Sequence, residues 1–163
     1  MTTFRVDFVR GKDRPRFTGT GRTYTTKRTH DDEQAIRAAY IDAIEKEGNV
    51  LPAEHQTGRE PFILLVDAYR ALPKSRPKKV LCEEDTFKPD WDNIGKLVSD
   101  ALNGLAWKDD CQVVKADISK WPRMRGLEND RMVITVIPLG LMNMDEVAEV
   151  DPCRSQAKTS TSR

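Results

Sequence analysis

Residues 88–110 read KPDWDNIGKLVSDALNGLAWKDD, and this stretch contains the clearest helical pattern in the chain. Its apolar residues recur at i, i+3, i+4, i+7, i+8 and i+11, the spacing of a helix with one buried face. These residues are Ile94, Leu97, Val98, Ala101, Leu102 and Leu105. Asn103-Gly104 marks the C-terminal end. The pattern predicts a helix that packs on a core and carries a polar face outward.

Acidic residues lie on both sides of this helix. Asp90 and Asp92 are two apart, so in an extended stretch they face the same way while Trp91 points away from them into the core. Asp92, Lys96 and Asp100 follow at i, i+4 and i+8, which forms a polar stripe opposite the apolar face.

The loop after the helix adds Asp109 and Asp110. Carboxylates without histidine or cysteine are the ligand set for Mg²⁺ or Mn²⁺. Clustered carboxylates repel unless cations compensate them. Lys96 alone is too little for four aspartates, and a divalent ion would complete the balance.

Each of these residues also has a simpler interpretation when it is taken alone. Asp92 could be the N-cap of the helix, a position that aspartate favours. Asp109-Asp110 could be a polar turn, and Lys96 a solvated lysine. Only the combination points to a site.

Composition sets the class of protein. The 163 residues are 33% charged and 38% hydrophobic, which suits one domain with a modest core. The net charge is +1, but residues 1–30 hold eight basic and two acidic residues, a local charge of +6. A basic arm beside acids suits an enzyme that acts on a polyanion through metal ions, although an ordinary balanced surface remains an alternative.

Other chemistries are poorly supported. Three cysteines without a C-x-x-C pair imply no disulfide framework or zinc site and fit a reducing cytoplasm. Two distant histidines argue against a Ser-His-Asp triad. No apolar run resembles a signal peptide or reaches the ~20 residues of a membrane span.

The remaining pattern predicts an α/β (α+β) fold. Strands are expected at residues 4–9, 23–26, 61–71, 112–118 and 132–137, and a first helix at residues 31–47, capped by Asp31 or Asp32. The order predicts a single domain over residues 1–140, a mixed β-sheet with helices packed on it. Residues 141–163 are expected to form a disordered tail.

Three sets of motifs together resemble RusA-type Holliday junction resolvases, particularly phage and prophage members. The central set is Lys88-Pro89-Asp90-x-Asp92-Asn93-x-x-Lys96, Asp100-Ala101-Leu102-Asn103-Gly104 and Trp107-Lys108-Asp109-Asp110-x-Gln112-Val113. The opening Gly11-Lys12-Asp13-Arg14-Pro15-Arg16-Phe17, with Thr23-Tyr24-Thr25-x-Lys27, and Leu72-Pro73-Lys74-Ser75 are similar too. The resemblance spans residues 4–138. The opening is shortened, and Trp91 stands where an aliphatic residue is usual.

This resemblance implies a homodimeric, Mg²⁺-dependent endodeoxyribonuclease, in which Mn²⁺ can substitute. It would resolve four-way DNA junctions by paired symmetric nicks in recombination and repair, leaving 5′-phosphate and 3′-hydroxyl ends. The implied metal ligands are Asp90, Asp92 and Asp110, with Lys96 as the catalytic lysine beside them. Asp100 and Asp109 match family positions as well, and would orient the metal ligands or cap backbone.

Basic residues are the candidate DNA contacts. They are Arg14, Arg16, Lys27, Lys74 and Lys88, which would bind phosphates without reading sequence. Two alternatives stay open: a catalytically silent dimer that binds branched DNA, and a protein whose acidic cluster binds Mg²⁺ only for stability.

Overall fold

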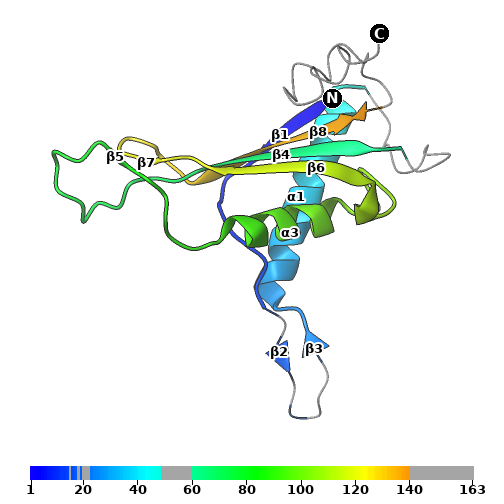
Figure 1. The fold of residues 1–163 in the computed structure, drawn as a ribbon, viewed down its shortest axis with the longest axis horizontal. Coiled ribbons are helices and arrows are strands. Elements are labelled where there is room, and N and C mark those ends of the chain that lie inside the picture. Colours follow the sequence, from blue (N-terminus) through cyan, green and yellow to red (C-terminus); the bar gives the residue numbers. More distant parts are fainter. Residues whose placement is uncertain (15, 18, 20–22, 49–59, 140–163) are drawn as a thin grey trace, which may run out of the picture.

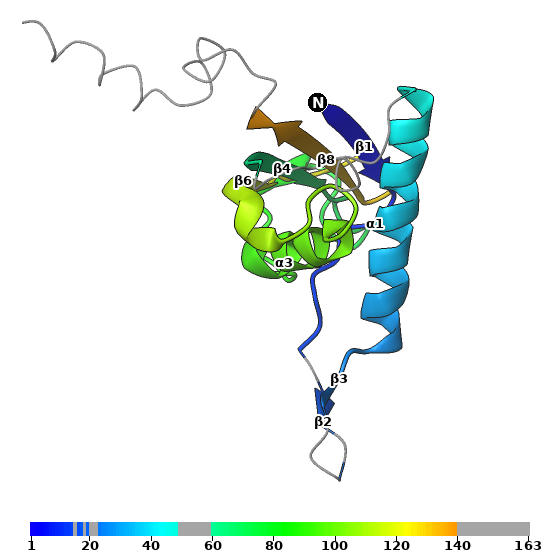
Figure 2. The same cartoon turned by 90° about the vertical axis from the view of Figure 1, so that its right-hand side faces the viewer.

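The computed structural model describes residues 1–14, 16–17, 19, 23–48 and 60–139. Within them, a four-stranded sheet has two helices on one face (Figures 1 and 2). This arrangement confirms the predicted mixed sheet with helices packed on it. The tail expected at residues 141–163 lies outside the described residues, as do Pro15 and Arg22.

The sheet has the strand order β1-β8-β4-β6. Its members are β1 (Thr2–Val6), β4 (Phe62–Tyr69), β6 (Val113–Lys120) and β8 (Arg131–Pro138). β8 is antiparallel to both β1 and β4, whereas β4 and β6 are parallel. A parallel pair needs a crossover connection, and helix α3 (Trp91–Leu102) provides it.

Helix α3 buries the face that its spacing predicts. Ile94, Leu97, Val98, Ala101 and Leu102 are at most 1% exposed, and Leu105 just beyond the helix is buried too. They pack with alternate residues of β4 and β8 and with Trp107 in one core. Burial of this many aliphatic side chains, each worth about 1.5–3 kcal/mol, anchors α3 under the sheet.

Helix α1 (Lys27–Lys46) starts earlier than predicted. Its N-cap is Thr26, whose hydroxyl accepts a hydrogen bond from Thr29 N, so neither Asp31 nor Asp32 caps the helix. Asp32 is instead buried and pairs with Arg10. The predicted start and cap were wrong because the first turn of α1 has no apolar periodicity to mark it. Threonine is nevertheless a good N-cap, so the helix begins there.

Two small ribbons extend from the domain (Figure 1). β2 (Arg16–Phe17) and β3 (Thr23–Tyr24) form a hairpin before α1, and β5 (Cys82–Glu83) pairs with β7 (Arg123–Met124). We call residues 70–90 and 121–130 the arm. A 3-10 turn, η1 (Asp110–Gln112), precedes β6.

No helix among the described residues has both the length and the apolar character needed to cross a membrane.

Candidate functional site

The start of α3 presents two carboxylates at the surface. Asp90 is the N-cap residue by backbone conformation, but its side chain makes no capping hydrogen bond. Asp92 lies in the first turn of the helix rather than at the cap, so the alternative interpretation of Asp92 as N-cap is wrong. The Asp90 carboxylate is therefore not engaged in capping the helix.

Trp91 corrects one prediction. It is the first residue of α3 and its side chain is 63% exposed, not buried in the core. The alternation argument assumed an extended stretch, whereas the chain turns into the helix at this residue. Trp91 therefore adds an aromatic surface next to the two acids.

Lys96 lies one turn after Asp92. Its Nζ atom is 3.1 Å from Asp92 Oδ2, and both side chains remain partly exposed. The hydrogen bond from Lys96 holds the pKa of Asp92 below its ordinary value. Asp92 is therefore ionised at neutral pH, and one cation and one anion face solvent together.

The N-terminal segment holds the acidic motif in place. A Cβ atom on Gly11 would lie 2.9 Å from the Cβ atoms of both Pro89 and Asn93, so only glycine fits here. Lys12 N donates to Asn93 O at 2.9 Å. The side chain of Lys12 pairs with Asp100 on the polar stripe, which gives Asp100 a partner within the fold.

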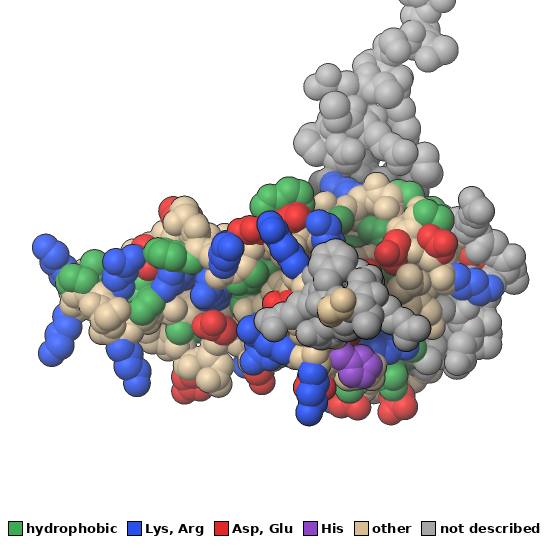
Figure 3. Space-filling model, turned by 90° about the horizontal axis from the view of Figure 1, so that it is seen from below, with side chains coloured by type: hydrophobic (Ala, Val, Ile, Leu, Met, Phe, Trp, Pro, Cys, Tyr) green, Lys and Arg blue, Asp and Glu red, His purple; other side chains and the backbone are tan. Residues whose placement is uncertain are grey.

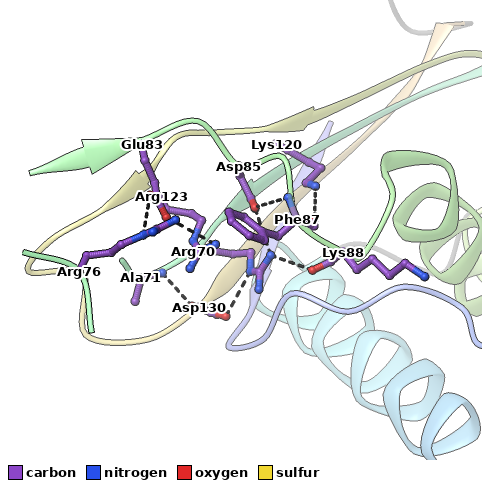
Figure 4. Close-up of polar contacts among 10 residues, drawn as sticks. All are labelled: Arg70, Ala71, Arg76, Glu83, Asp85, Phe87, Lys88, Lys120, Arg123 and Asp130. Carbon is purple, nitrogen blue, oxygen red and sulfur yellow. Dashed lines mark hydrogen bonds and ion pairs between the residues drawn. The ribbon is translucent and has the colours of Figure 1, made fainter. Parts of the chain in front are cut away.

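The arm fixes the chain that leads into Asp90 (Figure 4). Arg70 donates to both carboxylate oxygens of Asp85, at 3.2 and 3.3 Å, and the Asp85 side chain is fully buried. The same guanidinium donates to Lys88 O at 2.9 Å. Lys120 donates to Phe87 O from the end of β6. Sequence reasoning missed Lys12, Arg70 and Asp85, because their partners are far away along the chain.

Asp109 and Asp110 take different positions. Asp109 caps η1: its side chain accepts from Cys111 N at 2.9 Å, and Gln112 completes the capping box. Gln112 is buried and also donates to Glu60 O. Asp110 is exposed. Asp109 therefore caps backbone N–H groups, which is one of the two roles expected for it.

The structure does not bring Asp110 to Asp90 and Asp92 within one chain. Helix α3 has 12 residues, a length of about 18 Å. Gly95, near its start, packs on Ile118, near the end of β6, so α3 and β6 run in opposite directions. Asp110 belongs to η1, which follows α3 and directly precedes β6, so it lies beyond the opposite end of α3 from Asp90 and Asp92.

This separation leaves two of the three expected metal ligands together in one chain. Within the part of the chain that the structure describes, no three His, Cys, Asp or Glu residues are grouped so that they could hold a metal ion. Asp90, Asp92 and Lys96 come together, and the third expected ligand does not.

The candidate DNA contacts are distributed over the surface. Arg14, Lys27, Lys74 and Lys88 are exposed, and Arg16 lies in β2, where its side chain is outside the described part. Figure 3 shows Lys and Arg side chains spread along the arm. Exposed Lys74, Arg76, Lys78 and Lys79 all belong to its loop.

Comparison with known proteins identifies the family of this chain. The family described as Endodeoxyribonuclease RusA matches residues 8–136, most of the chain. The chain belongs to this family, which confirms the resemblance of its motifs. It is also 45% identical over 69 residues to Uncharacterized protein YqaN of Bacillus subtilis (strain 168). That match covers 37% of this chain and 49% of YqaN, so it spans about half the length of that curated relative.

Proposed function

We propose that this chain is a divalent-metal-dependent endodeoxyribonuclease that cuts four-way DNA junctions as a homodimer. The observation that carries the proposal is the start of α3 in a member of the RusA family. There, Asp90 is exposed and makes no capping hydrogen bond, Asp92 is partly exposed, and Lys96 lies one turn away and donates to Asp92.

The chain's own side chains suit phosphodiester hydrolysis. Lys96 is an exposed cation that can bind a phosphoryl oxygen and stabilise charge that grows there during reaction. Its present partner, Asp92, keeps it oriented toward the acidic end of α3. Basic groups on the hairpin and the arm would bind flanking phosphates and position the backbone.

The proposed enzyme uses Mg²⁺, or Mn²⁺ in its place, because carboxylates and a phosphate repel one another unless a cation lies between them. When bound, such an ion supplies an activated water and neutralises phosphoryl charge. Asp90 and Asp92 offer two carboxylates, and among the residues that the structure describes no third acid, histidine or cysteine is grouped with them in one chain. We infer that Asp110 comes from a second copy, so that each metal site combines two chains.

Cleavage of a labelled four-way junction tests the function. The purified protein is expected to nick the junction in Mg²⁺ or Mn²⁺ but not in EDTA, and linear duplex should be cut far less. Asp90→Asn, Asp92→Asn and Asp110→Asn should each lose at least ~100-fold in cleavage rate while still binding the junction. Asp42→Asn, an exposed acid on α1, is the matched control and should cleave normally. Tight junction binding without nicks in any metal would replace this proposal with the silent binder.

Mixing two inactive variants tests the shared site. Refolding Asp92→Asn together with Asp110→Asn produces heterodimers in which one site has all its carboxylates and the other lacks two. About a quarter of the wild-type sites would return, because half of the dimers are mixed and each has one intact site. These dimers should make single nicks rather than paired ones. No recovery, with heterodimers verified by mass, would mean that each chain forms its site alone.

A further inference from the structure

The outer end of the arm is a short loop that carries charge of one sign. Residues 73–81, which we call the tip loop, read PKSRPKKVL and hold four basic residues and no acidic one. Lys74, Lys78 and Lys79 are exposed, and the loop extends away from the domain (Figures 1 and 3). Concentrated positive charge on a projecting loop attracts a polyanion such as DNA.

The tip loop is held in one shape by Arg125, which directly follows β7. Its guanidinium donates to Val80 O at 2.8 Å and to the carbonyls of Arg76 and Pro77 at 3.1 and 2.9 Å. Two turns add to this, since Arg76 N donates to Pro73 O and Val80 N to Pro77 O. Because the loop is already ordered, it loses little conformational entropy when it binds.

The side chains of the tip loop are poorly suited to reading base edges in the major groove. Asn and Gln, which recognise adenine there, are missing from it. Arg76 could recognise guanine, but its Nε atom lies 2.8 Å from Glu83 Oε2. The lysines are point charges on flexible stems and respond mainly to electrostatic potential.

We propose that the tip loop binds in the minor groove of one duplex arm of the junction, with Lys78 and Lys79 in the groove, and that it selects A·T-rich sequence there. A·T-rich tracts have a narrow minor groove, whose enhanced negative potential attracts inserted lysine and arginine side chains. A G·C pair instead places the guanine amino group in this groove. That group is a donor and opposes an ammonium group, which can only donate.

Exposed apolar side chains beside the lysines support a groove rather than a phosphate as the partner. Leu81 in the tip loop is 69% exposed, and Met124 on the neighbouring strand β7 is 53% exposed. Seven large apolar side chains are exposed in the described part of the chain, and the arm holds four of them: Leu81, Phe87, Trp121 and Met124. Proteins that bind the minor groove commonly insert leucine or methionine there, whereas a phosphate offers such side chains no contact.

The arm would place this contact on DNA that adjoins the proposed site, and in that respect the inference rests on the proposed function. Asp90 both ends the arm and occupies the N-cap position of α3. The arm therefore leaves the domain at the acidic end of that helix (Figure 1). The preference would concern base pairs in the duplex beside the branch point and not the bases at the cut.

Binding to three junctions tests the groove. They share one branch point and differ in their arms, which contain A·T, G·C or inosine·C pairs, and EDTA prevents cutting. Inosine lacks the minor-groove amino group of guanine but keeps its major-groove acceptors. Junctions with A·T and inosine·C arms should bind about equally, and at least about five-fold more tightly than the G·C junction. Equal affinity for all three would mean phosphate contacts alone, and tighter binding of both G·C and inosine·C would mean the major groove. Either result would overturn the proposal.

Variants of the two lysines assign the preference to the tip loop. Lys78→Gln/Lys79→Gln should reduce the A·T-over-G·C ratio to below about two-fold, whereas Lys78→Arg/Lys79→Arg should keep it. Lys46→Gln, an exposed lysine on α1, is the control and should leave the ratio unchanged. A ratio that survives Lys78→Gln/Lys79→Gln would overturn the proposal. Because no step requires cleavage, a preserved preference in a protein that cuts no junction would reject the nuclease function alone.

Discussion

Tyr40 shows how burial of a single polar atom fixes a pH dependence. Its ring is fully buried and packs edge-on against Phe4, and its hydroxyl has no hydrogen-bond partner within the described structure. Burial, and then the charge of Glu47, raises the pKa of Tyr40 far above its ordinary value. The folded chain therefore keeps this phenol neutral at every pH at which the protein is handled.

Tyr40 should make the fold sensitive to alkali. An unfolded tyrosine ionises above about pH 10 and the folded one does not, so stability is lost as pH rises past 10, by up to about 1.4 kcal/mol per pH unit. Tyr40→Phe should remove this loss and leave stability at pH 7 unchanged or higher by up to about 1 kcal/mol. Urea unfolding between pH 7 and pH 11 measures both. Tyr69→Phe, a partly exposed control, should keep the wild-type slope, and an unchanged slope in Tyr40→Phe would contradict the assignment.

Gly11 matters because it lets the backbone of the N-terminal segment come close to the start of α3. Its backbone lies against Pro89 and Asn93, where an added methyl group would collide with two Cβ atoms and with the Asn93 backbone. Gly11→Ala should therefore cost about 1–3 kcal/mol of stability and reduce cleavage by displacing the start of α3. Thermal unfolding and junction cleavage measure the two effects. Gly19→Ala has open space around its Cβ and should change neither, so equal losses in both variants would point to a general effect of alanine.

At the scale of elements, the arm is held by a buried ion pair. Arg70 at the end of β4 contacts Asp85 and the Lys88 carbonyl, and Arg123 stacks over Phe87 at 4.4 Å (Figure 4). Removing one partner of such a pair leaves an uncompensated buried charge. The arm therefore transmits its own stability to the segment that leads into Asp90.

Asp85→Asn should lower the free energy of unfolding by about 3 kcal/mol, whereas exposed neighbour Glu84→Gln should change it by less than about 0.5 kcal/mol. Denaturant unfolding measures both. Replacing the pair by Arg70→Met and Asp85→Leu should recover most of the stability, since apolar substitutes avoid desolvation. It should not recover cleavage, because the contact to Lys88 O is lost. Full activity in that double variant would show that the Arg70 contact does not position the acidic motif.

The elements that the sequence predicted well are those with periodic apolar residues. Ile94 to Leu105 mark α3 because one face is buried along its whole length, and β4, β6 and β8 carry long apolar or alternating runs. β2, β5 and β7 have two residues each, too few for any period. Their positions depend on pairing partners distant in sequence.

The candidate site was predictable in composition and not in geometry. Spacing identifies Asp92 and Lys96 as neighbours, because both lie on one helix. Spacing cannot show that Asp110 returns at the opposite end of that helix, since this follows from the parallel pairing of β4 and β6. The partners of Lys12 and Arg70 follow from tertiary packing in the same way.

On the scale of the whole molecule, two extensions leave the domain: the hairpin, which Arg14 precedes, and the arm, which contains Lys74 and Lys88 (Figure 1). In the proposed junction complex, such an arrangement would let phosphates on two sides of the branch point be held at once. Each neutralised phosphate releases counterions, so binding should weaken steeply as salt rises.

Binding of the junction is described by the slope of the logarithm of the binding constant against the logarithm of the salt concentration. Lys74→Ala and Lys88→Ala should each reduce the magnitude of this slope by about 1, because each lysine neutralises one phosphate. The double variant should reduce it by about 2. Binding of a labelled junction between ~50 and ~200 mM salt gives these slopes. Lys46→Ala, at the exposed end of α1 and paired with Asp42, is the matched control and should leave the slope unchanged. The two single effects should also add, since in the proposed complex Lys74 and Lys88 would contact separate phosphates. A wild-type slope in the double variant would mean that the DNA does not lie along the arm. The DNA backbone would then be expected to bind at the hairpin and at Lys27, the first residue of α1.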